Sequence, residues 1–262
     1  MKKKILLLFF LTAVFILGLT FYKTVLSPKE TIAPASGPAV LGIPSREDKE
    51  PLELEWGGSK IKVSWFVADD ASKIFLYPNS GKLTSKDFMA KEKCKFLVNS
   101  GYYKADFSPT GLLISEYQKV SSFVASKTAD GIFSVNDFAT PRITSEIPKD
   151  RLRLALQAGP ILKENSFKKV LKLKSDELAR RVIVGVTGAN QAVFIVFYDS
   201  QSVYKGPFLS NLPDLVEKFE KASGIILADV LNLDGGTASV FISDKLNLPE
   251  AVFSGSFFCA KQ

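Results

Sequence analysis

The sequence predicts an α+β fold in which a mixed, largely antiparallel β-sheet carries a few covering helices. Many short apolar segments are typical of strands, two or three helices are expected, and strands and helices do not alternate in the regular way of a parallel sheet. The 262 residues, 46% hydrophobic and 23% charged, are typical of a folded protein with one large domain or two small ones.

The N-terminus has the pattern of an export signal. Lys2, Lys3 and Lys4 precede an uncharged apolar run over residues 5–22. The run is near the lower limit for a membrane span, about 18 residues. We expect residues 1–26 to form either a signal peptide, cleaved near Ala33-Pro34-Ala35, or an anchor with its lysines in the cytoplasm. An anchor is slightly favoured, because the cleavage-like site lies far from the apolar run. Either way, we expect an extracytoplasmic protein, periplasmic or at the cell surface, that is membrane-anchored or secreted.

Residues 27–52 are rich in Pro, Gly, Ala, Ser and charge, which indicates a linker, and residues 53–262 form the predicted domain. Its first half shows alternating or buried strand patterns and one short helix over residues 85–91, with Ser85 as the N-cap. The strands of this half are expected at residues 61–67, 73–77, 95–98, 111–115, 134–138 and 152–157.

The second half of the domain begins with a predicted hairpin. Two apolar, β-branched runs at 181–186 and 192–198 flank a turn-like Gly188-Ala189-Asn190. An amphipathic helix is expected over residues 213–222, because Leu215, Val216 and Phe219 share one face. The later strands are expected at residues 225–227, 230–233, 240–242 and 252–258.

Composition limits the possible chemistry. The chain has no His, which excludes His-based zinc sites, Ser-His-Asp triads and Cys-His dyads. The formal net charge of +7 is scattered, so nucleic acid binding is not expected, and either a solvated basic face or a mild attraction to anionic surfaces or substrates remains open. Cys94 and Cys259 could pair in an oxidising compartment or stay as two buried thiols.

Four apolar strands deliver polar or Gly-rich clusters at their ends. Strand ends hold side chains in place, and glycine lets a ligand approach the backbone. Each cluster alone fits an ordinary turn, but the four together indicate a site. They are Phe96-Leu97-Val98-Asn99-Ser100-Gly101-Tyr102-Tyr103, Leu156-Gln157-Ala158-Gly159-Pro160, Arg181-Val182-Ile183-Val184-Gly185 and Leu231-Asn232-Leu233-Asp234-Gly235-Gly236-Thr237-Ala238-Ser239.

In this order, the four clusters resemble the phosphodiester glycosidase family, which includes bacterial exported proteins and the animal uncovering enzyme for N-acetylglucosamine-1-phosphodiesters. The resemblance covers roughly residues 54–258 and departs from the family pattern at Ser100, Val182 and Ala238. It implies an exported hydrolase that cleaves a sugar-phosphodiester bond, with a carbohydrate phosphodiester or envelope glycan as partner.

The resemblance also implies roles for individual residues. Asp234 would stabilise the sugar cation or activate water, and Arg181 would grip the phosphate. A second carboxylate is sought at Asp106, Glu116 or Asp199. Substrate-binding roles are expected for Asn99, Gly101, Tyr102, Tyr103, Gln157, Gly159, Gly235, Gly236 and Thr237.

Three alternatives stay open at this stage. A Ca²⁺ ion could complete the site, since Asp234, Asn99 and backbone carbonyls are hard oxygen ligands. The domain could be a non-catalytic glycan-binding protein of the cell envelope, because a fold does not secure a function. It could also be an exopolysaccharide-processing glycosidase on the same scaffold.

Overall fold

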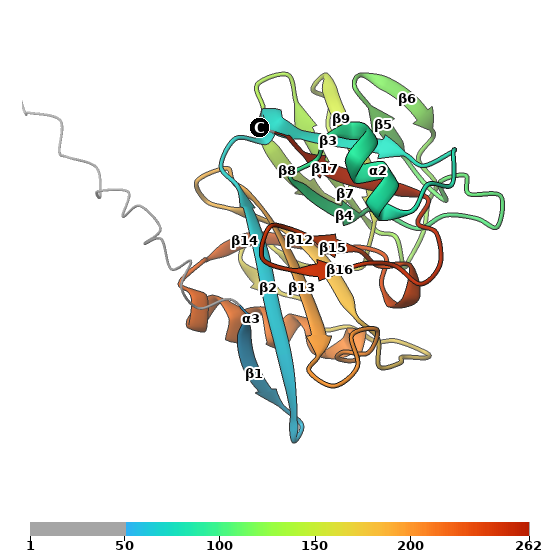
Figure 1. Ribbon diagram of the computed structural model, residues 1–262. Helices are drawn as coiled ribbons and strands as arrows, with labels where there is room; N and C mark the ends of the chain where they lie inside the picture. The colour runs from blue at the N-terminus through green and yellow to red at the C-terminus, as the bar shows by residue number, and fades with distance from the viewer. Residues whose placement is uncertain (1–50, 262) are drawn as a thin grey trace, which may run out of the picture. The chain divides into compact units, whose positions relative to one another are not determined.

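The computed structural model describes residues 51–261, and its largest element is a seven-stranded antiparallel sheet (Figure 1). The predicted hairpin forms its centre, with Ile183 opposite Ile195. The strands, in spatial order, are β1 (Leu52–Trp56), β2 (Ser59–Ala68), β13 (Ala192–Asp199), β12 (Arg181–Thr187), β14 (Leu227–Asn232), β10 (Ile161–Glu164) and β11 (Phe167–Lys168).

Two five-stranded sheets complete the β-structure, and all of their strand pairs are antiparallel as well. The first, called here the β4 sheet, has the order β16 (Asn247–Leu248), β15 (Phe241–Ile242), β4 (Phe96–Asn99), β17 (Ser256–Ala260) and β3 (Ile74–Pro78). The second, called here the β9 sheet, has the order β6 (Gln118–Ser121), β5 (Leu113–Ser115), β9 (Leu152–Ala158), β7 (Gly131–Asn136) and β8 (Pro141–Thr144).

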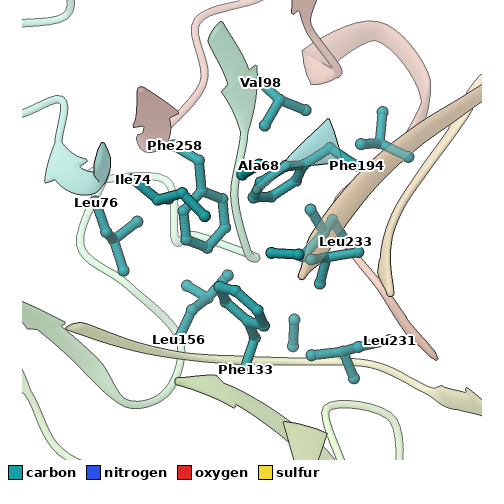
Figure 2. Close-up of a cluster of buried hydrophobic side chains, with 14 of the residues drawn as sticks. Ala68, Ile74, Leu76, Val98, Phe133, Leu156, Phe194, Leu231, Leu233 and Phe258 are labelled. Carbon is teal, nitrogen blue, oxygen red and sulfur yellow. The ribbon is translucent and has the colours of Figure 1, made fainter. Parts of the chain in front are cut away.

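One apolar core joins the three sheets (Figure 2). Phe194 comes from the seven-stranded sheet, Phe258 from the β4 sheet and Phe133 from the β9 sheet, and all three side chains are fully buried. Their rings contact one another, with centroids 5.2 to 6.2 Å apart. Burying such side chains stabilises the fold by roughly 2 to 3 kcal/mol each, so this core fixes how the strand ends that carry the site lie relative to one another.

Within residues 51–261, two α-helices cover outer faces of the sheets. Helix α3 (Leu212–Ser223) packs Leu215, Val216 and Phe219 against the seven-stranded sheet, as its amphipathic pattern predicts. Helix α2 (Ser85–Glu92) covers the β4 sheet through Phe88. Its N-cap is Thr84, whose hydroxyl accepts a hydrogen bond from the backbone of the helix's first turn, so the prediction of Ser85 was wrong by one residue. Three short 3-10 helices, Ala71–Lys73, Leu209–Asn211 and Gly236–Ala238, complete the helical structure described.

The disulfide lies beside α2. Cys94 precedes β4, Cys259 lies in the middle of β17, and their sulfurs are bonded across 165 residues of chain. Of the two states that the sequence left open, the structure contains the paired one.

Most predicted elements are present, but the segments expected at 225–227 and 230–233 form the single strand β14, and the arrangement of the strands differs from expectation in two ways. Three sheets take the place of the one expected, and every described strand pair is antiparallel where a mixed sheet was expected. The first strand, β1, begins at Leu52, the last residue of the expected linker, and the final strand begins at Ser256 rather than Val252.

The predicted signal or anchor, and nearly all of the predicted linker, lie outside the described residues. Within residues 51–261, no helix is long and apolar enough to span a membrane.

Candidate functional site

The centre of the candidate site is the pair Asp234 and Arg181: Arg181 begins β12, and Asp234 lies two residues beyond the end of the adjacent strand β14. Strands β12 and β14 are antiparallel with Ile183 opposite Asn232, and the pairing continues through the 2.9 Å hydrogen bond from Leu233 N to the Val182 carbonyl. This register places Arg181 opposite Asp234. Because side chains two residues apart on a strand share a face, Asn232 and Asp234 lie on one face with Ile183 and Arg181.

The strand end of β4 holds Asp234 in place. The Asp234 amide donates to the Ser100 carbonyl at 3.0 Å, and its own carbonyl accepts from Asn99 Nδ2 at 2.7 Å. The other end of the Asn99 amide accepts the Val240 N–H at 2.8 Å, and Asn99 is fully buried. Asn99 therefore positions the loop, whereas a contact with substrate was expected.

Burial controls the ionisation of Asp234. Desolvation raises the pKa of its carboxyl to about 6, although the Gly235 N–H and the positive charge of Arg181 both favour the ionised form. The carboxylate oxygen Oδ1 accepts the Gly235 N–H at 3.0 Å. At neutral pH the group is ionised but close to its pKa, as is suitable for a general base.

Arg181 is held from behind by the segment before β12 and by the loop before α3. Its Nε donates to the Pro207 carbonyl at 3.2 Å, and Nη2 donates to the Glu177 carbonyl at 2.5 Å and to Asp176 Oδ1 at 3.3 Å. The hydrogen bonds described for residues 51–261 leave Nη1 unused. This nitrogen is 3.6 Å from the position that a Cβ on Gly235 would take. Burial lowers the pKa of the guanidinium, which still stays positive at neutral pH.

Two tyrosines from the predicted cluster also lie near Asp234. The Tyr102 hydroxyl donates to the Gly159 carbonyl at 2.5 Å and accepts from Asn232 Nδ2 at 3.1 Å. Burial raises the pKa of Tyr102 to about 12, and the Asp234 charge adds to this shift, so the phenol stays protonated. The same two effects raise the pKa of Tyr103.

Tyr103 is part of a small aromatic group. Its hydroxyl donates to the Phe253 carbonyl at 2.6 Å, and its ring lies nearly parallel to that of Phe107, with centroids 5.4 Å apart. A Cβ on Gly255 would come within 2.6 Å of Tyr103, so the close approach of this ring requires glycine there. Tyr103 is thereby fixed beside the site.

Gln157 supports the β9 sheet rather than the site. Its Oε1 accepts the N–H groups of Leu112 and Val124, each at 3.1 Å, and its Nε2 donates to the carbonyls of Val124 and Ala129 at 2.6 and 2.8 Å. These four bonds use the amide's whole capacity. The expected substrate contact of Gln157 is therefore replaced by a role in holding the loops beside β9.

The predicted glycines bring backbone segments into close contact. A Cβ on Gly101 would lie 2.9 Å from the Gln157 carbonyl, and one on Gly235 would lie 2.9 Å from the Arg180 carbonyl. Gly236 has a φ of 67°, and its N–H donates to the same Arg180 carbonyl at 2.8 Å. This left-handed turn returns the chain against β12 directly after Asp234.

Two further predicted positions border the site. Gly159 has a φ of 154°, and its carbonyl accepts from Tyr102 and Asn232. Thr237 has an exposed side chain, and its carbonyl accepts the N–H groups of Ala251 and Val252. Gly159 thus anchors Tyr102, whereas the hydroxyl of Thr237 stays open to solvent, and its predicted contact with substrate stays a prediction.

Two residues that shape the site were given no role from the sequence, although Asn232 belongs to the fourth strand-end cluster. Asn232 lies two positions before Asp234, and strand alternation could have placed it on the same face. Arg180 is fully buried on the opposite side of its strand from Arg181. Its Nε donates to Ser239 Oγ at 2.7 Å and its Nη2 to the Pro249 carbonyl at 2.8 Å, and burial lowers its pKa to about 10.

The suggested second carboxylates all have local partners. Asp106 accepts the Ser108 N–H, and Asp199 accepts the N–H groups of residues 201 and 202. Glu116 pairs with Arg153 at 2.9 Å. A carboxyl group nearer to the site belongs to Asp130, which accepts the Ile161 N–H at 2.8 Å beside Gly159 and whose pKa is raised by burial.

A metal site is not evident in residues 51–261, where no three His, Cys, Asp or Glu side chains gather closely enough to hold an ion. Of the predicted Ca²⁺ ligands, the Asn99 oxygen already accepts the Val240 N–H. A Ca²⁺ site would therefore rest on Asp234 and backbone carbonyls, and it stays a prediction.

Comparison with protein families gives one match. The model of the family described as phosphodiester glycosidase matches residues 92–255, which include all four strand-end clusters. No curated protein matches the chain.

Several solved structures share the fold. The catalytic domain of zebrafish N-acetylglucosamine-1-phosphodiester alpha-N-acetylglucosaminidase, auto-inhibited by its pro-peptide, aligns with a TM-score of 0.54 and 12% identity over 77% of this chain and 83% of that one. A hypothetical protein from Synechocystis aligns with a TM-score of 0.53 and 12% identity over 80% of this chain and 61% of that one. A Burkholderia pseudomallei protein aligns with a TM-score of 0.54 and 11% identity over 78% and 75% of the two chains.

Proposed function

Because the chain belongs to the phosphodiester glycosidase family, we propose that it hydrolyses the bond between the anomeric carbon of a sugar and a phosphodiester. The observation that carries this proposal is the proximity of Asp234, two residues beyond the end of β14, to Arg181 at the start of the adjacent strand β12. A partly buried carboxylate beside a buried guanidinium matches a substrate whose sugar becomes positive as its phosphate departs. We propose an N-acetylglucosamine-1-phosphodiester or a closely similar sugar as the substrate.

The chemistry divides between the two side chains. Cleavage of the C1–O bond leaves the electron pair on the phosphate oxygen, and Arg181 binds the resulting negative charge with a guanidinium whose Nη1 faces the loop. Asp234 takes the proton of the attacking water, whose oxygen bonds to C1. The products are a free sugar and a phosphomonoester. The phosphate is a weak base, so its departure needs no strong general acid.

The surroundings of Asp234 favour catalysis over binding alone. Simple recognition of a sugar does not need a carboxylate whose pKa is raised to about 6 by burial. Perturbed ionisable groups of this kind cluster at sites of chemistry. We also propose that the domain acts outside the cytoplasm on an envelope glycan or carbohydrate phosphodiester, held near the membrane by its N-terminal segment.

The first test is hydrolysis of the methyl phosphodiester of N-acetylglucosamine 1-phosphate. We expect wild-type protein to release N-acetylglucosamine, and Asp234→Asn to lose at least about a hundredfold in kcat/KM. Asp244→Asn is the matched control, because Asp244 is exposed and is not part of the site. A folded Asp234→Asn protein with wild-type activity would contradict the role of Asp234. Binding of the compound without turnover by wild type would support the glycan-binding alternative.

The second test separates phosphate recognition from sugar recognition. Arg181→Ala should lose about 10²- to 10³-fold in kcat/KM on the phosphodiester and much less on an uncharged aryl N-acetylglucosaminide. Arg142→Ala, at an exposed ion pair on β8, is the control. Equal losses on the two substrates would count against a phosphate contact by Arg181.

A further inference from the structure

The side-chain oxygen of Asn232 has no hydrogen-bond partner among the described residues, although it is buried. The residue is 2% exposed. Its Nδ2 donates to the Gly159 carbonyl at 2.9 Å and to the Tyr102 hydroxyl at 3.1 Å. The orientation of the amide is fixed by these bonds, because the reverse orientation would place two acceptor oxygens, Oδ1 and the Gly159 carbonyl, against each other.

Folding does not explain why an amide occupies this position. A buried acceptor without a partner is destabilising, and native proteins contain few of them. Leucine has nearly the same size and would leave no polar atom unpaired, since the Gly159 carbonyl would still accept from Tyr102. The Asn232 amide therefore makes the fold less stable than an apolar side chain at this position would.

The position of this oxygen relates it to the proposed reaction. Asn232 lies two residues before Asp234 on one strand face and pairs with Ile183, two residues beyond Arg181. Asp234 and Arg181 are proposed to act on the sugar and its phosphate. Asn232 Oδ1, which has no partner among the described residues, therefore belongs to the next polar side chain on the same face.

We propose that Asn232 is a substrate-binding residue whose Oδ1 accepts a hydrogen bond from a hydroxyl or amide N–H of the sugar. This inference rests on the proposed function and deepens it, because it assigns a residue that selects for a hydrogen-bond donor on the sugar ring. The oxygen is covered in the structure. Tyr102 is partly exposed and is bonded to the other end of the same amide, and the proposal requires a small displacement of the groups around this amide to admit the sugar.

The test combines protein variants with substrate analogues that lack one donor each. The substrates are the methyl phosphodiester of N-acetylglucosamine 1-phosphate and its analogues without the acetamide or without the 3-, 4- or 6-hydroxyl. In wild type, one analogue should lose about tenfold in kcat/KM relative to the parent compound. Asn232→Leu should lose about tenfold on the parent and show no further loss on that analogue.

Tyr102→Phe is the matched control, because it removes one of the two partners of Nδ2 and keeps the Oδ1 acceptor. Whatever its overall rate, it should retain the tenfold difference between the parent and that analogue. The melting temperature of Asn232→Leu should equal or exceed that of wild type. The melting temperature thereby distinguishes an Asn232 amide that binds substrate from one that is needed for the stability of the fold.

Two results would overturn the inference while leaving the proposed function intact. One is an Asn232→Leu enzyme that keeps the wild-type ratio for every analogue. The other is a loss of the fold in both Asn232→Leu and Asn232→Ala, since the amide would then serve the structure. If wild type cleaves none of the compounds, the proposed function itself is contradicted, and the inference is contradicted with it.

Discussion

Asp234 has an ionisation that should be visible in the rate of the reaction. Burial raises the pKa of its carboxyl to about 6, and the proposed general base is the ionised form. We therefore expect kcat/KM to fall tenfold per pH unit below about pH 6 and to level off above it. A pH–rate profile of wild-type protein checks this. An acid limb near pH 4, where an ordinary Asp titrates, would show that burial does not control the base.

The same carboxylate should lower the stability of the fold at neutral pH. Its pKa is higher in the folded state than in the unfolded chain, so the contribution to stability is complete below about pH 4 and is lost as pH rises through about 6. Replacing Asp234 with Asn removes this cost. We expect Asp234→Asn to raise the free energy of unfolding by about 2 to 3 kcal/mol at pH 8 and by much less at pH 4. Urea unfolding at the two pH values measures the difference, and Asp244→Asn should show none.

The sequence was informative about groups at the ends of neighbouring strands. Asp234 and Arg181 lie close enough for the Arg181 charge to act on the Asp234 carboxyl, as their positions at strand ends predict, and their catalytic roles stay predictions. Asn99 and Gln157 were misjudged, because their partners are far away along the chain. Asn99 bonds to residues 135 and 141 positions later, and Gln157 to residues 28 to 45 positions earlier. No local pattern shows that an amide is already fully hydrogen-bonded.

At the scale of elements, the turn between β9 and β10 depends on Gly159. A Cβ there would lie 2.4 Å from the Thr128 carbonyl, and its φ of 154° is unfavourable for other residues. Gly159→Ala should therefore lower the free energy of unfolding by about 2 kcal/mol or more and weaken the anchor of Tyr102. Gly188→Ala is the control, because nothing lies within 4 Å of its Cβ position. Equal melting temperatures for the two variants would contradict this role.

The elements themselves were largely predictable, whereas their partners were not. The β12–β13 hairpin follows from two β-branched runs around a short turn, and its register is local. Helix α3 follows from its apolar face. In contrast, β17 inserts between β3 and β4, which precede it by more than 150 residues. Strand patterns carry no information about such distant pairings, so the division into three sheets could not be foreseen.

For the molecule as a whole, the Cys94–Cys259 disulfide should contribute strongly to stability. It closes a loop of 165 residues, for which chain entropy alone gives about 5 kcal/mol as an upper value. We expect the melting temperature to fall by several degrees when dithiothreitol is added. The double variant Cys94→Ser/Cys259→Ser should melt at the lower temperature with or without the reductant. The prediction fails if dithiothreitol leaves the melting temperature of wild-type protein unchanged and two free thiols are titrated in the sample without reductant. That result would show that the disulfide does not form.

The position of β17 near the C-terminus means that the support of Asp234 is completed late in synthesis. The Ser256 carbonyl accepts the Ser100 N–H, and the Ser100 carbonyl in turn accepts the N–H of Asp234. A polypeptide that crosses a membrane from its N-terminus delivers β3 and β4 long before the strand that belongs between them. Until that strand arrives, the support under Asp234 is missing. If the chain is exported and acts as a hydrolase, as proposed above, a chain that has not yet delivered β17 should be inactive, and hydrolysis should begin only after the whole domain has emerged.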